Sequence, residues 1–100
     1  MIPAQLQEAV QAALQDAASR SGLAAARLQV VLAEPVTWPN GSLGCPAPGR
    51  MYTQALVPGY RIRIAAGSQT LEYHGGRDGP PSYCPAERVS QPVPGATGGT

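Results

Sequence analysis

The chain begins with apolar side chains at the spacing of an amphipathic helix. They recur every three or four residues and so share one side of a helix whose other side is polar; the stripe consists of Ile2, Leu6, Val10, Ala13, Leu14 and Ala17. Pro3 suits a first helical turn, where its missing N–H is not needed. Asp16 and Arg20 stand four residues apart as a favourable pair, and Gly22 suits a left-handed cap. The pattern predicts a helix over residues 3–20.

Residues 27–38 place apolar side chains at every second position, which is the period of a half-buried strand. The apolar residues of one parity are Leu28, Val30, Leu32, Val36 and Trp38. Glu34 interrupts this parity and Pro35 cannot donate to a strand ladder, so we expect a bulge or a sheet-edge position near these two residues. Because Trp38 continues the parity of the residues before it, we expect its side chain to be buried.

The middle of the chain predicts two turns between strands. Residues 51–57 and 60–66 have strand character around Pro58–Gly59, and because this dipeptide fits a tight hairpin poorly, we expect a wider loop there. Gly67–Ser68 fits a type II′ turn with glycine first. The resulting register matches apolar with apolar and polar with polar side chains; its pairs are Ile64 with Leu71, Ile62 with Tyr73, Arg63 with Glu72, and Arg61 with His74.

These elements together predict an α+β fold. An N-terminal helix packs on the apolar face of a four-stranded antiparallel sheet, a plan shared by cystatin-like and PepSY-like domains; this analogy concerns the fold and carries no function. We expect residues 1–87 to form a single domain. Residues 75–87 are typical of a Gly/Pro-rich loop, here carrying Cys84, and residues 88–100 of a flexible tail that buries nothing.

Charge and hydropathy narrow the classes of function. The net charge of the 100 residues is +1, with no block of like charge, which argues against nucleic-acid binding. No apolar run approaches the roughly 18 residues that identify a transmembrane helix. We therefore expect neither a nucleic-acid partner nor a transmembrane segment.

Two cysteines in so short a chain favour one disulfide, Cys45–Cys84, and an oxidising compartment. Each cysteine precedes a proline in a loop rich in Gly and Pro, and such a loop has no core of its own. Two free, buried thiols in a cytosolic protein are the alternative. A bridge that closes a loop of roughly 39 residues contributes about 4 kcal/mol of stability in the chain-entropy account.

Candidate catalytic and metal-binding chemistry centres on His74, the only histidine. Metal binding there would need Glu72, Asp78 or Glu87 as further ligands, and we interpret His74 instead as an exposed cross-strand partner of Arg61. A thiol nucleophile, Cys45 or Cys84, is excluded by the disulfide. A triad from Ser42 or Ser82 with His74 and Asp78 lacks a nucleophile-elbow motif. We expect no enzyme activity, no metal and no cofactor.

The segment 39–50 is the strongest candidate for a binding surface. It contains three prolines and Cys45, and we expect it to present Asn40, Ser42, Leu43 and Arg50 from a fixed base. Rigid loops lower the entropic cost of binding; alternatively, the loop merely plugs one end of the sheet. The leading hypothesis is a monomeric, non-enzymatic interaction domain for an extracytoplasmic protein or a cell-wall component. The alternatives are an inhibitor of an extracellular protease and, remotely, a small hydrolase that uses His74.

The same segment carries a family resemblance. Residues 38–49 read W-P-N-G-S-L-G-C-P-A-P-G, followed by Tyr52, V-P-G-Y-R-I at 57–62, E-Y-H at 72–74 and Cys84. Over residues 4–85 this arrangement resembles a family of bacterial exported domains and lipoproteins of unknown function, with a W-P-x-x-S-L-G-C-P-x-P-G loop. The resemblance implies a disulfide and a secreted, periplasmic or surface-anchored location, and it implies no activity. We expect the signal segment to lie outside this chain, since none is recognisable at its start.

Overall fold

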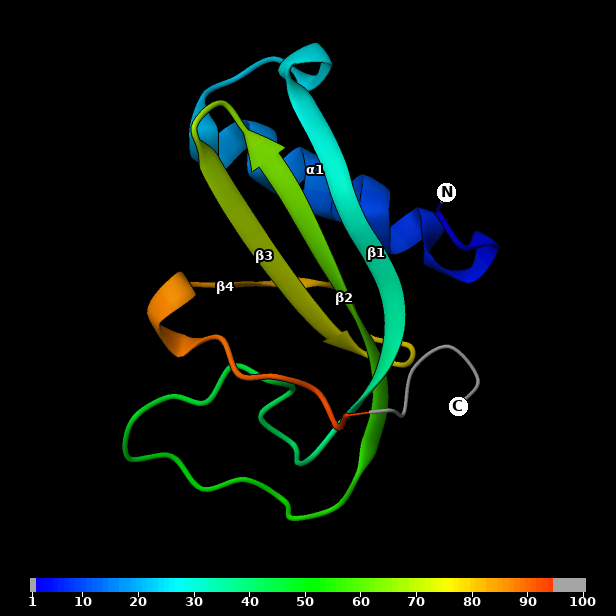
Figure 1. The fold of residues 1–100 in the computed structure, drawn as a ribbon, viewed down its shortest axis with the longest axis vertical. Coiled ribbons are helices and arrows are strands. Elements are labelled where there is room, and N and C mark those ends of the chain that lie inside the picture. The colour runs from blue at the N-terminus through cyan, green and yellow to red at the C-terminus, as the bar shows by residue number, and fades with distance from the viewer. Residues whose placement is uncertain (1, 95–100) are drawn as a thin grey trace.

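The computed structural model describes residues 2–94 and has one α-helix on one face of a four-stranded antiparallel sheet (Figure 1). The strands lie in the order β1-β2-β3-β4, which confirms the predicted α+β fold. No helix in residues 2–94 is long and apolar enough to cross a membrane. The elements are the short 3-10 turn η1 (Ala4–Leu6), α1 (Gln7–Ser21), η2 (Ala25–Arg27), β1 (Leu28–Trp38), β2 (Val57–Ala66), β3 (Gln69–Gly76), β4 (Ser82–Cys84) and η3 (Ala86–Arg88).

Helix α1 follows the predicted pattern and ends where its cap residue was expected. Gly22 adopts φ +76°, and its N–H donates to the Ala18 carbonyl at 2.9 Å. Arg20 pairs with Asp16 at 2.9 Å, and the Asp16 carboxylate also accepts a hydrogen bond from the Tyr73 hydroxyl at 2.6 Å. This second bond ties the exposed side of the helix to β3.

The hairpin β2–β3 has the predicted register, with Ile62 opposite Tyr73 and Ile64 opposite Leu71. Gly67 has φ +64° and no other residue of the turn has a positive φ, as a type II′ turn requires. The apolar side of this hairpin packs under the helix. The main core consists of Leu6, Val10, Ala13, Ala17, Tyr60, Ile62, Ile64, Ala66, Leu71 and Tyr73.

Strand β1 differs from the prediction because its bulge lies at Val31 instead of near Glu34–Pro35. The pairing with β2 shifts between Val30 and Leu32, and the extra residue reverses which side of the sheet the following side chains face. Leu28 and Val30 pack toward the helix, and after the bulge Ala33 takes over that side. The expected edge position is confirmed, since β1 is an outer strand.

The bulge places Trp38 on the sheet face opposite the helix, where it starts a second, smaller core. Its side chain is fully buried, as predicted, but on the opposite sheet face from Leu28 and Val30, whose parity it shares in the sequence. The indole ring lies beside Gly44 and Gly59 and 4.4 Å, between ring centroids, from His74. Its Nε1–H donates to the Gly75 carbonyl at 3.2 Å. The protein therefore has apolar packing on both faces of the sheet.

Three other predictions about the elements are wrong. Residues 51–56 form no strand, and Pro58–Gly59 is no turn, because β2 runs through both residues from Val57. Pro58 lies beyond the last β2–β3 pair, Gly59–Gly76, so its missing N–H costs no bond to β3. Cys84 was expected in a loop but lies in β4, opposite Glu72.

Residues 89–94, which fall in the predicted tail, run along the molecule and contact it. The Ser90 N–H donates to the Gly44 carbonyl and the Val93 N–H to the Thr37 carbonyl, both at 2.8 Å. The second bond covers part of the outer edge of β1. Residues 95–100 of the predicted tail lie outside the described residues.

The close packing at Gly59 predicts a position-specific effect of an added methyl group. A Cβ there would overlap the Trp38 ring and the Gly75 carbonyl, whereas a Cβ at its partner Gly76 meets nothing within 4 Å. We expect Gly59→Ala to lower the free energy of unfolding by about 1–3 kcal/mol, the usual cost of overpacking, and Gly76→Ala to change it little. Urea denaturation of both variants measures this difference, and equal effects would contradict the second core.

Candidate functional site

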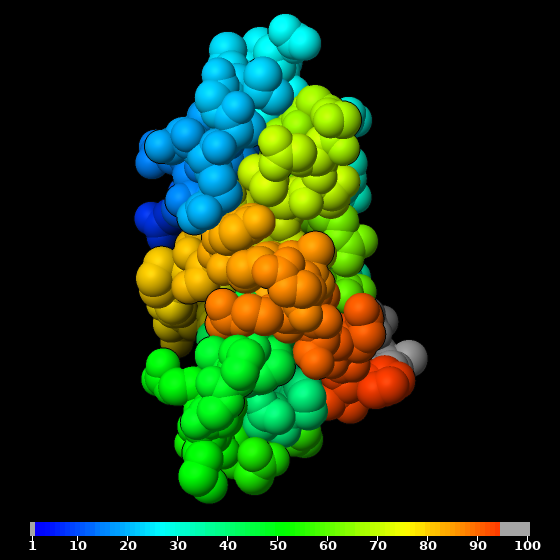
Figure 2. Space-filling model, turned by 90° about the vertical axis from the view of Figure 1, so that its left-hand side faces the viewer, coloured from blue at the N-terminus to red at the C-terminus, as the bar shows by residue number. Residues whose placement is uncertain are grey.

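The long connection between β1 and β2, residues 39–56, is here called the stapled loop. The Cys45–Cys84 disulfide, with a Cα–Cα distance of 5.8 Å, joins it to β4 and confirms the predicted bridge. At the base of the loop the Gly41 N–H donates to the Thr53 carbonyl at 2.9 Å. Figure 2 shows the loop as a compact mass that adjoins the segment after β4. There Arg88 donates to the Cys45 and Pro46 carbonyls at 3.3 and 3.1 Å.

Leu43 occupies a strained backbone position within this loop. It has φ +56° and Gly44 has φ +73°, and the tight turn closes with a 3.0 Å bond from the Cys45 N–H to the Ser42 carbonyl. A positive φ at a leucine costs about 1 kcal/mol or more. This turn presents the Leu43 carbonyl to His74 Nδ1 at 2.8 Å. This hydrogen bond helps to hold the strained turn in place.

His74 is buried, with 2 % of its surface exposed, so the prediction of an exposed partner for Arg61 is wrong. The two residues are register partners, but Arg61 instead pairs with Glu34 at 2.6 Å. His74 Nε2 lies 2.8 Å from Glu72 Oε2, so both ring nitrogens face oxygen atoms. A carbonyl oxygen and an ionised carboxylate are both hydrogen-bond acceptors, so the ring is held between two acceptors.

Glu72 links His74 to Arg63. Its other oxygen accepts from Arg63 Nε at 2.7 Å. Burial of the carboxyl group opposes ionisation, but the hydrogen bonds from His74 and Arg63 outweigh it and lower the pKa of Glu72 to about 2. Glu72 is therefore an ionised, buried bridge between His74 and Arg63.

These contacts argue against the catalytic alternatives in which a cysteine or a serine is the nucleophile. Both cysteines are in the disulfide. The two nitrogens of His74 are engaged by Leu43 and Glu72, which leaves no free nitrogen to activate a serine. Within residues 2–94 no three His, Cys, Asp or Glu side chains are grouped to hold a metal. The absence of enzyme activity stays a prediction.

Of the four predicted binding residues, only Arg50 is exposed. Asn40, Ser42 and Leu43 are half-buried and serve the loop itself; the Asn40 Oδ1, for example, accepts from the Ser42 N–H at 2.9 Å. Sequence reasoning missed Met51, which is 96 % exposed. It also missed Leu56, at 64 %, since both fell in a predicted strand.

The part of the loop that projects is residues 46–56, here called the outer segment. Pro48 and Gly49, the latter with φ +77°, form a turn that the Arg50 N–H closes onto the Ala47 carbonyl at 3.2 Å. The Tyr52 hydroxyl accepts from the Ala47 N–H at 2.9 Å, across the segment. These bonds give an otherwise irregular stretch a defined shape.

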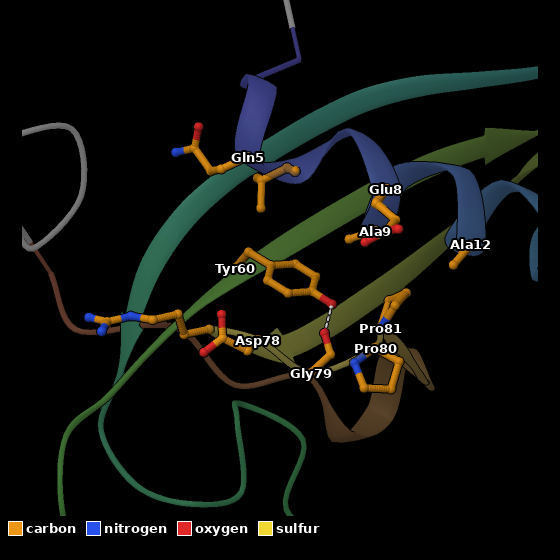
Figure 3. Close-up of a pocket in the computed structure, with 11 residues that line it drawn as sticks. Gln5, Glu8, Ala9, Ala12, Tyr60, Asp78, Gly79, Pro80 and Pro81 are labelled. Atoms are coloured by element: carbon orange, nitrogen blue, oxygen red, sulfur yellow. Dashed lines mark hydrogen bonds between the residues drawn. The ribbon is translucent and has the colours of Figure 1, made fainter.

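A groove of about 480 Å³ lies on the helix side, between the start of α1 and residues 77–81 (Figure 3). The buried Tyr60 ring lies at its base, and the Tyr60 hydroxyl donates to the Gly79 carbonyl at 2.7 Å. Burial raises the pKa of this hydroxyl. Pro80 and Pro81 line one side, and Glu8 and Ala9 the other. No local pattern in the sequence predicts this groove, because its sides are more than 60 residues apart in the chain.

The lowered pKa of Glu72 predicts an acid-sensitive contribution to stability. The folded pKa of about 2 lies below the unfolded value of 4.5, so the contribution is complete above pH 4.5 and is lost as the pH falls toward 2. We expect Glu72→Gln to destabilise the protein at neutral pH by at most about 3 kcal/mol, and the difference from the native protein to shrink on acidification. Urea unfolding across this pH range, with the exposed Glu87→Gln as control, measures it; a pH-independent difference would contradict the ionised bridge.

Comparison with known proteins places the domain but assigns it no activity. A family model described as a domain of unknown function (DUF8738) matches residues 10–84. The match runs from within α1 to Cys84 and thus includes all four strands, the stapled loop and both cysteines. No curated protein and no solved structure matches the chain. Because the match covers most of its length, the chain belongs to the DUF8738 family of domains of unknown function.

Proposed function

We propose that this protein is a non-enzymatic interaction domain that binds a protein partner through the outer segment of the stapled loop. The observation that carries the proposal is the exposure of Met51 and Leu56 on a segment whose shape is already fixed. Apolar side chains that a small domain leaves in solvent are a common mark of a binding surface. A preformed loop also loses little conformational entropy on binding.

An extracytoplasmic location belongs to this proposal. Cys84 is 1 % exposed, and its bridge to Cys45 attaches the loop to the sheet. Structural disulfides of this kind persist in oxidising compartments. We further propose a bacterial origin, which the family resemblance implies, and a cell-wall component as an alternative partner.

The contacts of His74 favour this binding function over the hydrolase alternative. A general base needs a ring nitrogen within hydrogen-bond reach of the proton that it removes. Here Trp38 and the stapled loop cover the ring, and Leu43 and Glu72 occupy its nitrogens. The arrangement is better suited to holding the loop than to chemistry on a substrate.

Site-directed photo-cross-linking in the producing organism tests the proposal. We expect a photo-reactive amino acid at position 51 or 56 to give one discrete adduct with a partner protein, because these positions are the centre of the proposed interface. The same probe at Val31, which is 52 % exposed on β1 and belongs to neither the loop nor the groove, is the control. Probes at Glu8 and Asp78 test the groove instead. If only these two give adducts, the site lies in the groove and the proposal is contradicted.

Affinity for the cross-linked partner gives a quantitative prediction. Replacing Met51 and Leu56 together by serine removes two apolar side chains that each contribute about 1.5 kcal/mol when buried, so binding weakens roughly hundredfold. The fold is unaffected, since both side chains lie mainly in solvent. Titration calorimetry with the purified partner measures the change. An unchanged Kd would show that the outer segment does not form the interface.

A further inference from the structure

Arg50 projects from the stapled loop beside its most exposed residue. Its side chain is exposed, and within residues 2–94 no carboxylate lies in salt-bridge range of it. The arginines that do pair with a carboxylate stabilise the fold. Arg20 pairs within the helix, Arg61 with Glu34 of the edge strand, and Arg63 with Glu72. Arg50 thus offers a guanidinium group to an external carboxylate.

The Arg50 N–H is bonded to the Ala47 carbonyl, and the backbone directly after it is open to a second contact. In the described part of the chain, no protein group pairs with the Met51 N–H, and residues 50–54 belong to no helix, turn or strand. Apart from Gly49, none of the residues from 46 to 54 has a positive φ. An exposed, irregular segment with unpaired backbone groups can add to the strand edge of a partner, which is how extended peptides are recognised.

The outer segment is also held on both sides of Arg50. Before it, Cys45 is bridged to Cys84 and the Cys45 and Pro46 carbonyls accept from Arg88. After it, the Tyr52 hydroxyl is bonded to the Ala47 N–H and the Thr53 carbonyl to the Gly41 N–H. Residues 47 to 52 are therefore held from both ends, and Arg50 and Met51 lie between these bonds, directly after the turn at Pro48–Gly49.

From these three observations we propose that the partner is a serine protease of trypsin-like specificity, and that the protein inhibits it by placing Arg50 in the protease's specificity pocket. Such a pocket has a carboxylate at its base and accepts an arginine or lysine side chain. A segment whose shape is already fixed loses less conformational entropy on binding than a flexible substrate does. Binding forms and breaks no covalent bond. This inference rests on the proposed function and adds to it the class of partner.

Inhibition of trypsin by the intact, disulfide-bonded protein is the test. We expect inhibition at micromolar concentration or below, and at least a hundredfold weaker inhibition by Arg50→Ala, because the pocket carboxylate loses its partner. Arg50→Lys retains inhibition of trypsin, and Arg50→Leu shifts it toward chymotrypsin, whose pocket is apolar. Arg27→Ala is the matched control, since Arg27 is exposed in η2 and outside the stapled loop; it leaves inhibition unchanged.

Three outcomes would overturn the inference. One is no inhibition of trypsin by the native protein, and another is equal inhibition by the native protein and Arg50→Ala. The third is rapid hydrolysis after Arg50 with no accumulation of inhibited enzyme, which would make the loop a substrate. If any of these occurs while the cross-link at position 51 persists, the interaction domain stands and the protease is excluded as its partner. Loss of the cross-link as well would remove both proposals.

Discussion

The burial of Trp38 on the sheet face that the helix leaves open is the constraint on which the loop depends. The ring fits there because Gly44 and Gly59 bring no side chains toward it, and its N–H is satisfied by the Gly75 carbonyl. A domain of this size gains little from a single core. Packing on the second face adds buried apolar surface and, at the same time, gives an irregular loop something to fold against.

The polar groups of this second core are as important as its apolar ones. His74 and Glu72 are both buried, and an unpaired ionisable group in such a place is strongly destabilising. Here each is matched: Leu43 and Glu72 on the histidine, and His74 and Arg63 on the glutamate. No buried side-chain nitrogen or oxygen in residues 2–94 lacks a partner. The strained turn at Leu43 is thus part of a satisfied network and is not an isolated defect.

The disulfide and the histidine fix the loop in different ways. The Cys45–Cys84 bridge restricts the unfolded chain across 39 residues of sequence separation. The His74–Leu43 bond acts only in the folded state, where it selects one conformation of the turn before the bridge. Together they hold the loop in place up to Cys45. The bonds of Ala47 and Thr53 also hold the residues on either side of Arg50 and Met51. Exposure of Arg50 and Met51 then reflects the shape of the loop and not its disorder.

The sequence by itself determined the elements whose signals are local. The helix stripe, the cap at Gly22 and the turn at Gly67 depend on residues a few positions apart, and the hairpin register followed from that turn. The disulfide was also predictable, since two cysteines allow only one bridge. Only the tertiary structure decided which face of the sheet each side chain of β1 occupies. A one-residue bulge at Val31 leaves the apolar alternation of the sequence unchanged, but it moves Trp38 to the opposite face. The tertiary structure likewise decided the burial of His74, since the loop that covers it lies 31 residues earlier in the chain and no local pattern reports that contact.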